Sequence, residues 1–219
     1  MGAPTQVYRL VEQFHANRDA YKSGHFDEAQ ARIDFINPLF KDALGWDVFN
    51  EKRLSETYRE VVYEDRVKVG GGTKAPDYGF YLGGQLKFFL EAKKPSVDIA
   101  GDVAPAFQLR RYAWTAKLPL SILTDFEELA IYDCRYEPFK TDKSTTARLN
   151  FITYDQYLDR WEDIYSLFSR EAVLSGSLEK FAEETKRKRK PGGIEFAFEP
   201  EQETACENTI QQSSAASGS

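Results

Sequence analysis

The chain has 219 residues, 42% of them hydrophobic and 14% aromatic, which is enough to bury one good core and too few for two large ones. Its two cysteines, which lie far apart, and its two histidines exclude a disulfide framework, a thiolate zinc site and a catalytic or metal site built from histidine. The net charge of −6 alone counts against a nucleic-acid partner, and the lack of a long apolar run or a signal-peptide core predicts a cytoplasmic protein with no membrane partner.

Residues 26–44 have the pattern of an amphipathic helix that ends at Gly45. The predicted buried stripe of this helix is Ala29, Ile33, Ile36 and Phe40. Pro38 interrupts the pattern, and Asn37 before it could cap a new helix. We therefore expect either a kink at the proline or two short helices.

The predicted sheet starts at residues 58–69, which are rich in Val and Tyr and run into three glycines. The second and third strands form a hairpin over residues 76–93. Three apolar cross-strand pairs on one face favour a single register, and they are Leu82 with Leu86, Phe80 with Phe88 and Tyr78 with Leu90. The same register sets Asp77 opposite Glu91 on the other face.

The hairpin loop decides whether those two carboxylates share a face. The register above needs a three-residue loop over positions 83–85, in which a glycine can fill the left-handed position. A two-residue Gly-Gly turn would instead place Asp77 and Glu91 on opposite faces. Lys93 shares a face with Glu91 in either case, because side chains alternate along a strand.

The rest of the chain completes an α/β pattern. A helix over residues 105–117 precedes two short strands, at 120–124 and 129–132, which an acidic turn joins. Helical stretches follow at 154–169 and 178–188. We therefore predict a mixed sheet of about five strands flanked by helices, in the order helix, three strands, helix, two strands, C-terminal helices.

The composition changes near the C-terminus. From residue 191 onward the chain has a Pro-Gly-Gly start, scattered acids and a Ser/Ala/Gly end, which indicates a flexible tail. We expect one domain over residues 1–190 and a tail over residues 191–219.

The hairpin can place two carboxylates and an amine around one metal ion. With histidine and cysteine excluded, such an ion would be held by oxygen, which suggests Mg²⁺ with Mn²⁺ as a substitute. A Pro-Asp followed by acid-x-Lys is a weak pattern, which about one chain in ten of this length contains by chance. The alternative is that Asp77 only begins a strand and that Glu91 and Lys93 form a solvent-facing ion pair.

Several longer blocks give the pattern a context over residues 26–185. They are DEAQARIDFINPLFKDALGWDV, APDYGFYL, FFLEAKKPSVDI, AFQLRRYAWTAKLPLSILTDFEELAIYDC and SREAVLSGSLEKFAEE. In these blocks the chain resembles the PD-(D/E)XK nucleases, with the N-terminal cleavage domain of type IIG restriction enzymes nearest and that of type I restriction motor subunits next. The resemblance implies a restriction-endonuclease-like core and a Mg²⁺-dependent endonuclease domain that hydrolyses phosphodiester bonds in double-stranded DNA.

The resemblance also implies roles for individual residues. Asp77, Glu91 and the helix acid Glu28 would be metal ligands, and Lys93 would be the catalytic lysine. The alternative for Glu28 is an i,i+4 ion pair with Arg32, with Asp27 as a rival acid.

Residues on the following helix match an accessory element. Gln108 and Tyr112 match a Gln-x-x-x-Tyr pattern of part of the superfamily and would orient the lysine or a DNA phosphate. They share a helical face, so plain packing is the alternative. Arg110, Arg111 and Lys94 are candidate phosphate contacts or, alternatively, solvated surface charges.

The chain departs from the larger enzymes in one respect. Residues 1–190 contain no glycine-rich methyl-donor loop, no Asn-Pro-Pro-aromatic motif and no Walker loop. We therefore expect the methyltransferase and specificity domains only in a full-length relative, and a transient dimer on DNA by resemblance. Two competing hypotheses are a non-catalytic DNA-binding or interaction module that keeps the nuclease fold, and an unrelated α/β domain.

Overall fold

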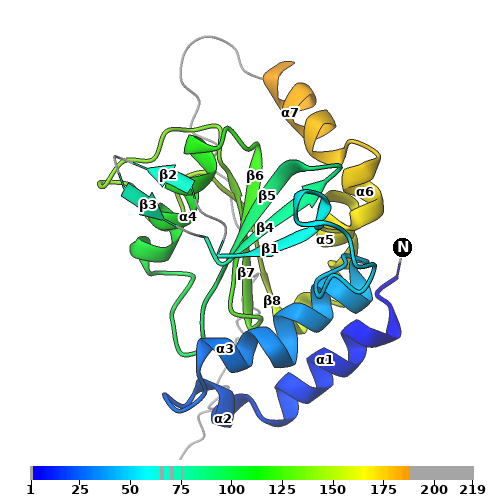
Figure 1. The fold of residues 1–219 in the computed structure, drawn as a ribbon. Helices are drawn as coiled ribbons and strands as arrows, with labels where there is room; N and C mark the ends of the chain where they lie inside the picture. The colour runs from blue at the N-terminus through cyan, green and yellow to red at the C-terminus, as the bar shows by residue number, and fades with distance from the viewer. Residues whose placement is uncertain (1, 65–66, 70–71, 75, 188–219) are drawn as a thin grey trace, which may run out of the picture.

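A six-stranded mixed sheet with helices on both faces forms the body of the protein (Figure 1). The computed structural model describes residues 2–64, 67–69, 72–74 and 76–187. The predicted α/β class is confirmed, and the main sheet has one strand more than the five or so expected. The tail expected at 191–219 lies outside the described residues, as do positions 65–66 of the predicted first strand.

The helical elements flank the sheet. In chain order they are α1 (Thr5–Ala16), α2 (Arg18–Lys22), α3 (Glu28–Ala31), the π-helical η1 (Arg32–Ile36) and η2 (Leu39–Ala43), the 3₁₀ turn η3 (Glu56–Tyr58), α4 (Val103–Thr115), the 3₁₀ turn η4 (Tyr154–Gln156), α5 (Trp161–Phe168), α6 (Arg170–Leu174) and α7 (Ser177–Arg187). No helix among the described residues has the length and apolar character needed to cross a membrane.

The main sheet has the strand order β1-β4-β5-β6-β7-β8. Its strands are β1 (Val61–Tyr63), β4 (Tyr78–Leu82), β5 (Gln85–Ala92), β6 (Leu120–Thr124), β7 (Glu128–Asp133) and β8 (Arg148–Thr153). A separate two-stranded ribbon pairs β2 (Val67–Val69) with β3 (Gly72–Lys74). The predicted first strand, residues 58–69, is therefore wrong as one element, because its two ends belong to different sheets.

Helix α4 is the crossover between the two parallel strands at the centre of the sheet. Strands β5 and β6 pair in parallel, whereas the other neighbours in the main sheet pair antiparallel. The pairing sets Glu91 beside Leu123, and just beyond it the amide of Lys93 donates to the carbonyl of Thr124 at 2.9 Å. The end of β5 thus lies between two partners, because it pairs with β4 on one side and with β6 on the other.

Two hydrophobic cores hold the layers together. One packs the sheet against the N-terminal and C-terminal helices, with the rings of Phe80 and Phe88 stacked at 4.4 Å and Trp46 edge-on to both. The other packs the opposite face against α4, around Phe89 and Leu109. Figure 1 shows this division, with α4 on one side of the sheet and α1, α3 and α5 on the other. Burial of both faces explains the nearly continuous apolar strands.

The hairpin register agrees with the prediction near Asp77 and Glu91, but the predicted three-residue loop is wrong. Tyr78 pairs with Leu90 and Phe80 with Phe88, as expected, yet the strands are joined by a two-residue turn. Its glycines, at positions 83 and 84, have φ of 57° and 78°. The register then shifts by one between Phe80 and Tyr81, which leaves Lys87 as an extra residue in a β-bulge. The two-residue turn alone would have put Asp77 and Glu91 on opposite faces of the sheet, and the bulge returns them to the same face.

The segment predicted as an amphipathic helix is helical without a break from Glu28 to Ala43, and it neither splits nor caps at Asn37. It ends at Gly45, whose φ is +80°, as expected. The predicted stripe is partly wrong, because Ala29 is exposed and Ile33 is 60% exposed. Two π turns rotate the buried face, so it consists of Ala31, Phe35, Ile36, Leu39, Phe40 and Ala43.

The remaining predicted elements are present with shifted ends. The strand predicted at 120–124 agrees with β6, and the helices at 105–117 and 178–188 differ from α4 and α7 by a few residues. The helix predicted at 154–169 is a 3₁₀ turn followed by α5. The prediction missed α1, α2, α6 and the edge strand β8.

Candidate active site

The ends of three elements bring four of the predicted side chains together. Asp77 directly precedes β4, Glu91 and Lys93 stand at the end of β5, and Glu28 is the first residue of α3. Helix α3 begins here because the side chain of Asp27 caps it by accepting from the amide of Gln30 at 2.7 Å. This cap makes Asp27 a structural residue and leaves Glu28 directed at the hairpin.

The ammonium of Lys93 is the centre of the cluster. Its Nζ lies 2.8 Å from Oε1 of Glu91, 3.8 Å from Oε2 of Glu28 and 4.0 Å from Oδ2 of Asp77. It also donates to the carbonyl oxygen of Ala92 at 2.7 Å. Burial alone would lower the pKa of Lys93, but the Glu91 carboxylate and the two other acids raise it. The lysine is therefore a cation in this arrangement.

Asp77 is fixed through both of its carboxylate oxygens. Its Oδ2 accepts from the amide of Ala92 at 2.7 Å, which ties the start of β4 to the end of β5. Its Oδ1 contacts a guanidinium nitrogen of Arg32, and the same nitrogen donates to Oε1 of Glu28 at 2.6 Å. Burial raises the pKa of Asp77, although the Arg32 charge opposes the shift.

Glu91 is the most buried of the three acids, with a side chain only 3% exposed. Its Oε1 accepts from Lys93 at 2.8 Å and from Nε2 of Gln108 at 2.6 Å. Its Oε2 is buried and has no hydrogen-bond partner among the described residues. Burial, and next the charge of Asp77, raise the pKa of Glu91 to about 7. The site therefore holds more acid than its two cations neutralise.

The accessory residues on α4 do not all face the cluster. Gln108 reaches Glu91 as described, and Tyr112 is 5% exposed and near enough that the Glu91 charge, after burial itself, raises the pKa of its phenol. Arg111 is half-buried, with its guanidinium 6.0 Å from the ring of Phe107. Lys94, just past β5, is partly exposed.

Arg110 is wrong as a phosphate contact. Its side chain is 1% exposed and forms an ion pair with Asp142 at 2.7 Å. Two of its nitrogens, Nε and a terminal one, are buried without a partner among the described residues. Neighbouring residues on a helix point about 100° apart, so Arg110 turns into the body of the protein while Arg111 stays near the surface.

The comparisons with known proteins place this chain in a family. Residues 25–140 match the family described as the type I restriction enzyme R protein N terminus, and they make up more than half of the chain. The chain belongs to this family. The match covers Glu28, Asp77, Glu91 and Lys93.

A second comparison finds a restriction enzyme that is similar to this chain. The type II restriction enzyme and methyltransferase RM.Eco57I of Escherichia coli is 42% identical over 178 residues. The alignment covers 80% of this chain and 18% of the relative, so the chain spans about a fifth of that protein's length. The resemblance to type IIG and type I restriction enzymes is thus confirmed. No solved structure matches significantly.

Sequence reasoning missed the part that Arg32 plays in this site. Arg32 was expected only as a possible ion-pair partner of Glu28, and it forms that pair, but it also contacts Asp77 from a position 45 residues away. The sequence places a basic residue one helical turn after the helix acid, which indicates the pair with Glu28 but not the contact with Asp77.

The donor set of this restriction-family site fits a hard divalent cation. Glu28, Asp77 and Glu91 supply carboxylate oxygens of the kind that Mg²⁺ and Mn²⁺ prefer, and Oε2 of Glu91 is a buried acceptor in need of a partner. Among the described residues no group of three or more acids, histidines or cysteines is arranged as an assembled metal site. The carboxylates instead contact the nitrogens of Arg32 and Lys93.

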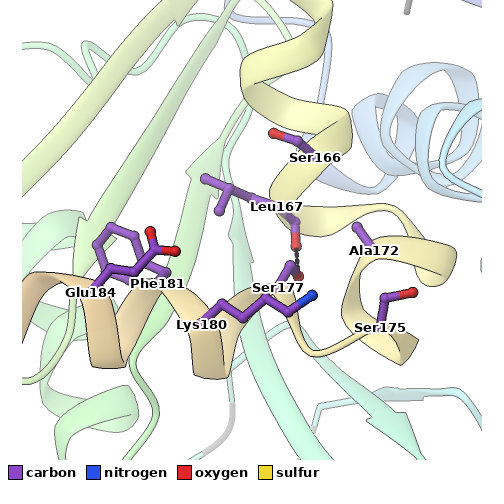
Figure 2. Close-up of a pocket in the computed structure, with 8 residues that line it drawn as sticks. All are labelled: Ser166, Leu167, Ala172, Ser175, Ser177, Lys180, Phe181 and Glu184. Atoms are coloured by element: carbon purple, nitrogen blue, oxygen red, sulfur yellow. Dashed lines mark hydrogen bonds between the residues drawn. The ribbon is translucent and has the colours of Figure 1, made fainter.

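A hollow of about 310 Å³ lies elsewhere, between α5, α6 and α7. Figure 2 shows its lining, in which the hydroxyl of Ser177 donates to the carbonyl of Leu167 at 2.7 Å. Its only charged lining residues are Lys180 and Glu184. None of the predicted site residues lines it, so this hollow and the carboxylate cluster are separate features.

Proposed function

We propose that the chain is the DNA-cleavage domain of a restriction-modification system and hydrolyses phosphodiester bonds of double-stranded DNA with Mg²⁺. The observation that carries the proposal is the position of Lys93, whose Nζ lies within 4.0 Å of the carboxylates of Glu28, Asp77 and Glu91. Membership of the restriction-enzyme family supports a nuclease role for that cluster.

In this proposal Asp77 and Glu91 would hold the metal ion directly, and Glu28, the third expected ligand, would act through a water molecule bound to it. When bound, Mg²⁺ would supply charge stabilisation at the scissile phosphate and a more acidic water. Both acids would hold the ion in their ionised forms, and the burial that raises the pKa of Glu91 to about 7 would oppose binding below that pH.

Lys93 acts on the phosphate and the attacking water. Because the surrounding acids raise its pKa, it serves as a cation that orients the water and stabilises negative charge on the phosphate oxygens. Gln108 donates to the same Glu91 oxygen as Lys93 and keeps that carboxylate in position. Tyr112, whose raised pKa keeps it a phenol, is a hydrogen-bond donor on the same helical face.

The partners follow from the family. We expect double-stranded DNA to lie across the carboxylate cluster, with Arg111 and Lys94 as the remaining candidate phosphate contacts. The relative's name combines a restriction enzyme with a methyltransferase, and this chain spans about a fifth of its length. In a full-length protein of that kind we expect methyltransferase and specificity regions beside this domain, and a transient dimer when both strands are cut.

One observation favours a second candidate. Arg32 and Lys93 contact the carboxylates of the cluster, and a module that kept these ion pairs and bound no metal ion would keep the fold without cutting. The two candidates differ in whether a divalent ion can displace Lys93 from the acids.

Cleavage of supercoiled plasmid DNA tests the proposal. The chain should nick the plasmid in Mg²⁺ or Mn²⁺ and stop in excess EDTA. Asp77→Ala and Glu91→Ala should lower the rate by about 10³-fold or more, because each removes a metal ligand. Glu51→Ala is the control, since this acid pairs with Lys41 on the surface. Equal nicking by all four proteins would contradict the catalytic assignment, and DNA binding without nicking would favour the second candidate.

A further inference from the structure

Arg32 fills the gap between two of the three acids. One terminal nitrogen of its guanidinium contacts both Oε1 of Glu28 and Oδ1 of Asp77. A single positive centre that joins two carboxylates in this way takes the place that a bridging divalent cation would take. Lys93 lies nearest to the third acid, Glu91, at 2.8 Å.

Contacts other than those with the acids also hold the Arg32 side chain in position. Arg32 starts the π-helical segment η1, one turn after Glu28, and its Cζ lies 5.7 Å from the centre of the Tyr78 ring. That ring is fixed in turn, because the Tyr78 hydroxyl donates to Oδ1 of Asn37 at 2.9 Å. The Nε of Arg32 is buried. The guanidinium is therefore held by its backbone, by an aromatic face and by close packing.

Lys93 is held in a different way, by a strand end and without an aromatic contact. It reaches the cluster from the end of β5 on a flexible four-carbon stem and donates hydrogen bonds to Glu91 and to the carbonyl of Ala92. Its ion pairs with Glu28 and Asp77 are longer, at 3.8 and 4.0 Å. An incoming divalent ion can displace such an ammonium from Glu91 and Asp77 without moving a helix. The same ion cannot take the place of Arg32 without breaking the contacts with Glu28, Asp77 and Tyr78 together.

We propose that Arg32 restricts the site to one divalent ion, by holding the position between Glu28 and Asp77 that a second ion would occupy. The inference rests on the proposed metal-dependent function and specifies how many divalent ions the site binds. It makes Arg32 a positioning residue, which acts through the two acids and leaves Glu28 as a holder of water.

Titration with Mn²⁺ by calorimetry tests this stoichiometry without any cleavage assay. The wild-type chain should bind one Mn²⁺. Arg32→Met keeps the length of the side chain but not its charge and should bind two, whereas Arg32→Lys keeps a cation in place and should bind one. Lys41→Met removes a positive charge that pairs with Glu51 on the surface and should also leave one ion. Glu28→Gln added to Arg32→Met should abolish the second ion.

The outcomes separate the inference from the proposed function. One ion in Arg32→Met, or two in the wild type, would overturn the role of Arg32 and leave a metal site standing. No binding by the wild type, with Asp77→Ala behaving identically, would overturn the proposed function. If circular dichroism shows that Arg32→Met fails to fold, the Mn²⁺ titration of the single variant Glu28→Gln tests the inference instead. It should still bind one ion, with an affinity within about threefold of the wild type, and loss of that ion would contradict the inference.

Discussion

The Nζ of Lys93 lies 2.8 Å from Oε1 of Glu91, yet Glu91 still has a pKa raised to about 7. An opposite charge at hydrogen-bond distance ordinarily lowers the pKa of a carboxyl group. Here burial and the charge of Asp77 outweigh the lysine. The metal-free cluster is thus an acid-rich site whose stability depends on protonation of Glu91.

The first prediction concerns stability against pH. The Glu91 carboxyl has a pKa of about 7 in the folded chain and 4.5 as an isolated group, so the folded state binds its proton more tightly. This contribution to the free energy of unfolding is fully present below pH 4.5 and is lost as the pH rises through 7, by about 3 kcal/mol in total. Urea unfolding of the metal-free chain at pH 5 and pH 8 should show the loss, and Glu91→Gln should show less of it. An equal loss in both proteins would refute the assignment.

The second prediction concerns the glycine turn. Gly84 has φ of +78°, and an added Cβ would lie 3.3 Å from the carbonyl oxygen of Thr57, whereas a Cβ on Gly83 would meet nothing within 4 Å. Gly83→Ala should cost about 1 kcal/mol for its left-handed backbone. Gly84→Ala should cost more, because it adds the close contact. Urea denaturation of the two variants measures both, and a smaller cost at Gly84 would argue against the turn.

The third prediction separates two neighbouring arginines. Arg110→Ala removes the partner of Asp142 and empties a buried space, so it should lower the free energy of unfolding by about 3 kcal/mol. Arg111→Ala loses a contact with the ring of Phe107 and should cost less than about 1 kcal/mol. Chemical denaturation of both variants checks this, and similar costs at the two positions would be inconsistent with the buried pair.

The hairpin shows how far residue patterns predict this site. The apolar pairs Tyr78 with Leu90 and Phe80 with Phe88 were predictable because burial of one face fixes a register. The turn was not, because two adjacent glycines fit both a two-residue and a longer loop. The bulge at Lys87 left no mark in the apolar pattern, although it is what keeps Asp77 and Glu91 together.

The helix before the hairpin shows the limit of periodicity. A stripe spaced at 3.6 residues includes Ile33, but the π turns add residues to the helix and carry Ile33 out to 60% exposure. The contact of Arg32 with Asp77 was equally beyond reach, since it depends on how the helix lies against the hairpin. The pairing of Arg32 with Glu28 is local and could be anticipated from sequence.

The central claim is that Lys93 is a catalytic residue at a nuclease site. Two lysines test it most directly, namely Lys93, which directly follows β5, and Lys87, which lies within β5. Lys87 pairs with Glu179 at 2.9 Å, away from the acids that surround Lys93. The measurement is the rate of plasmid nicking in Mg²⁺ by Lys93→Ala and Lys87→Ala, with folding checked by circular dichroism. Lys93→Ala should be slower than the wild type by about 10³-fold, and Lys87→Ala should be within about twofold of it. Equal rates for the two variants would contradict the account.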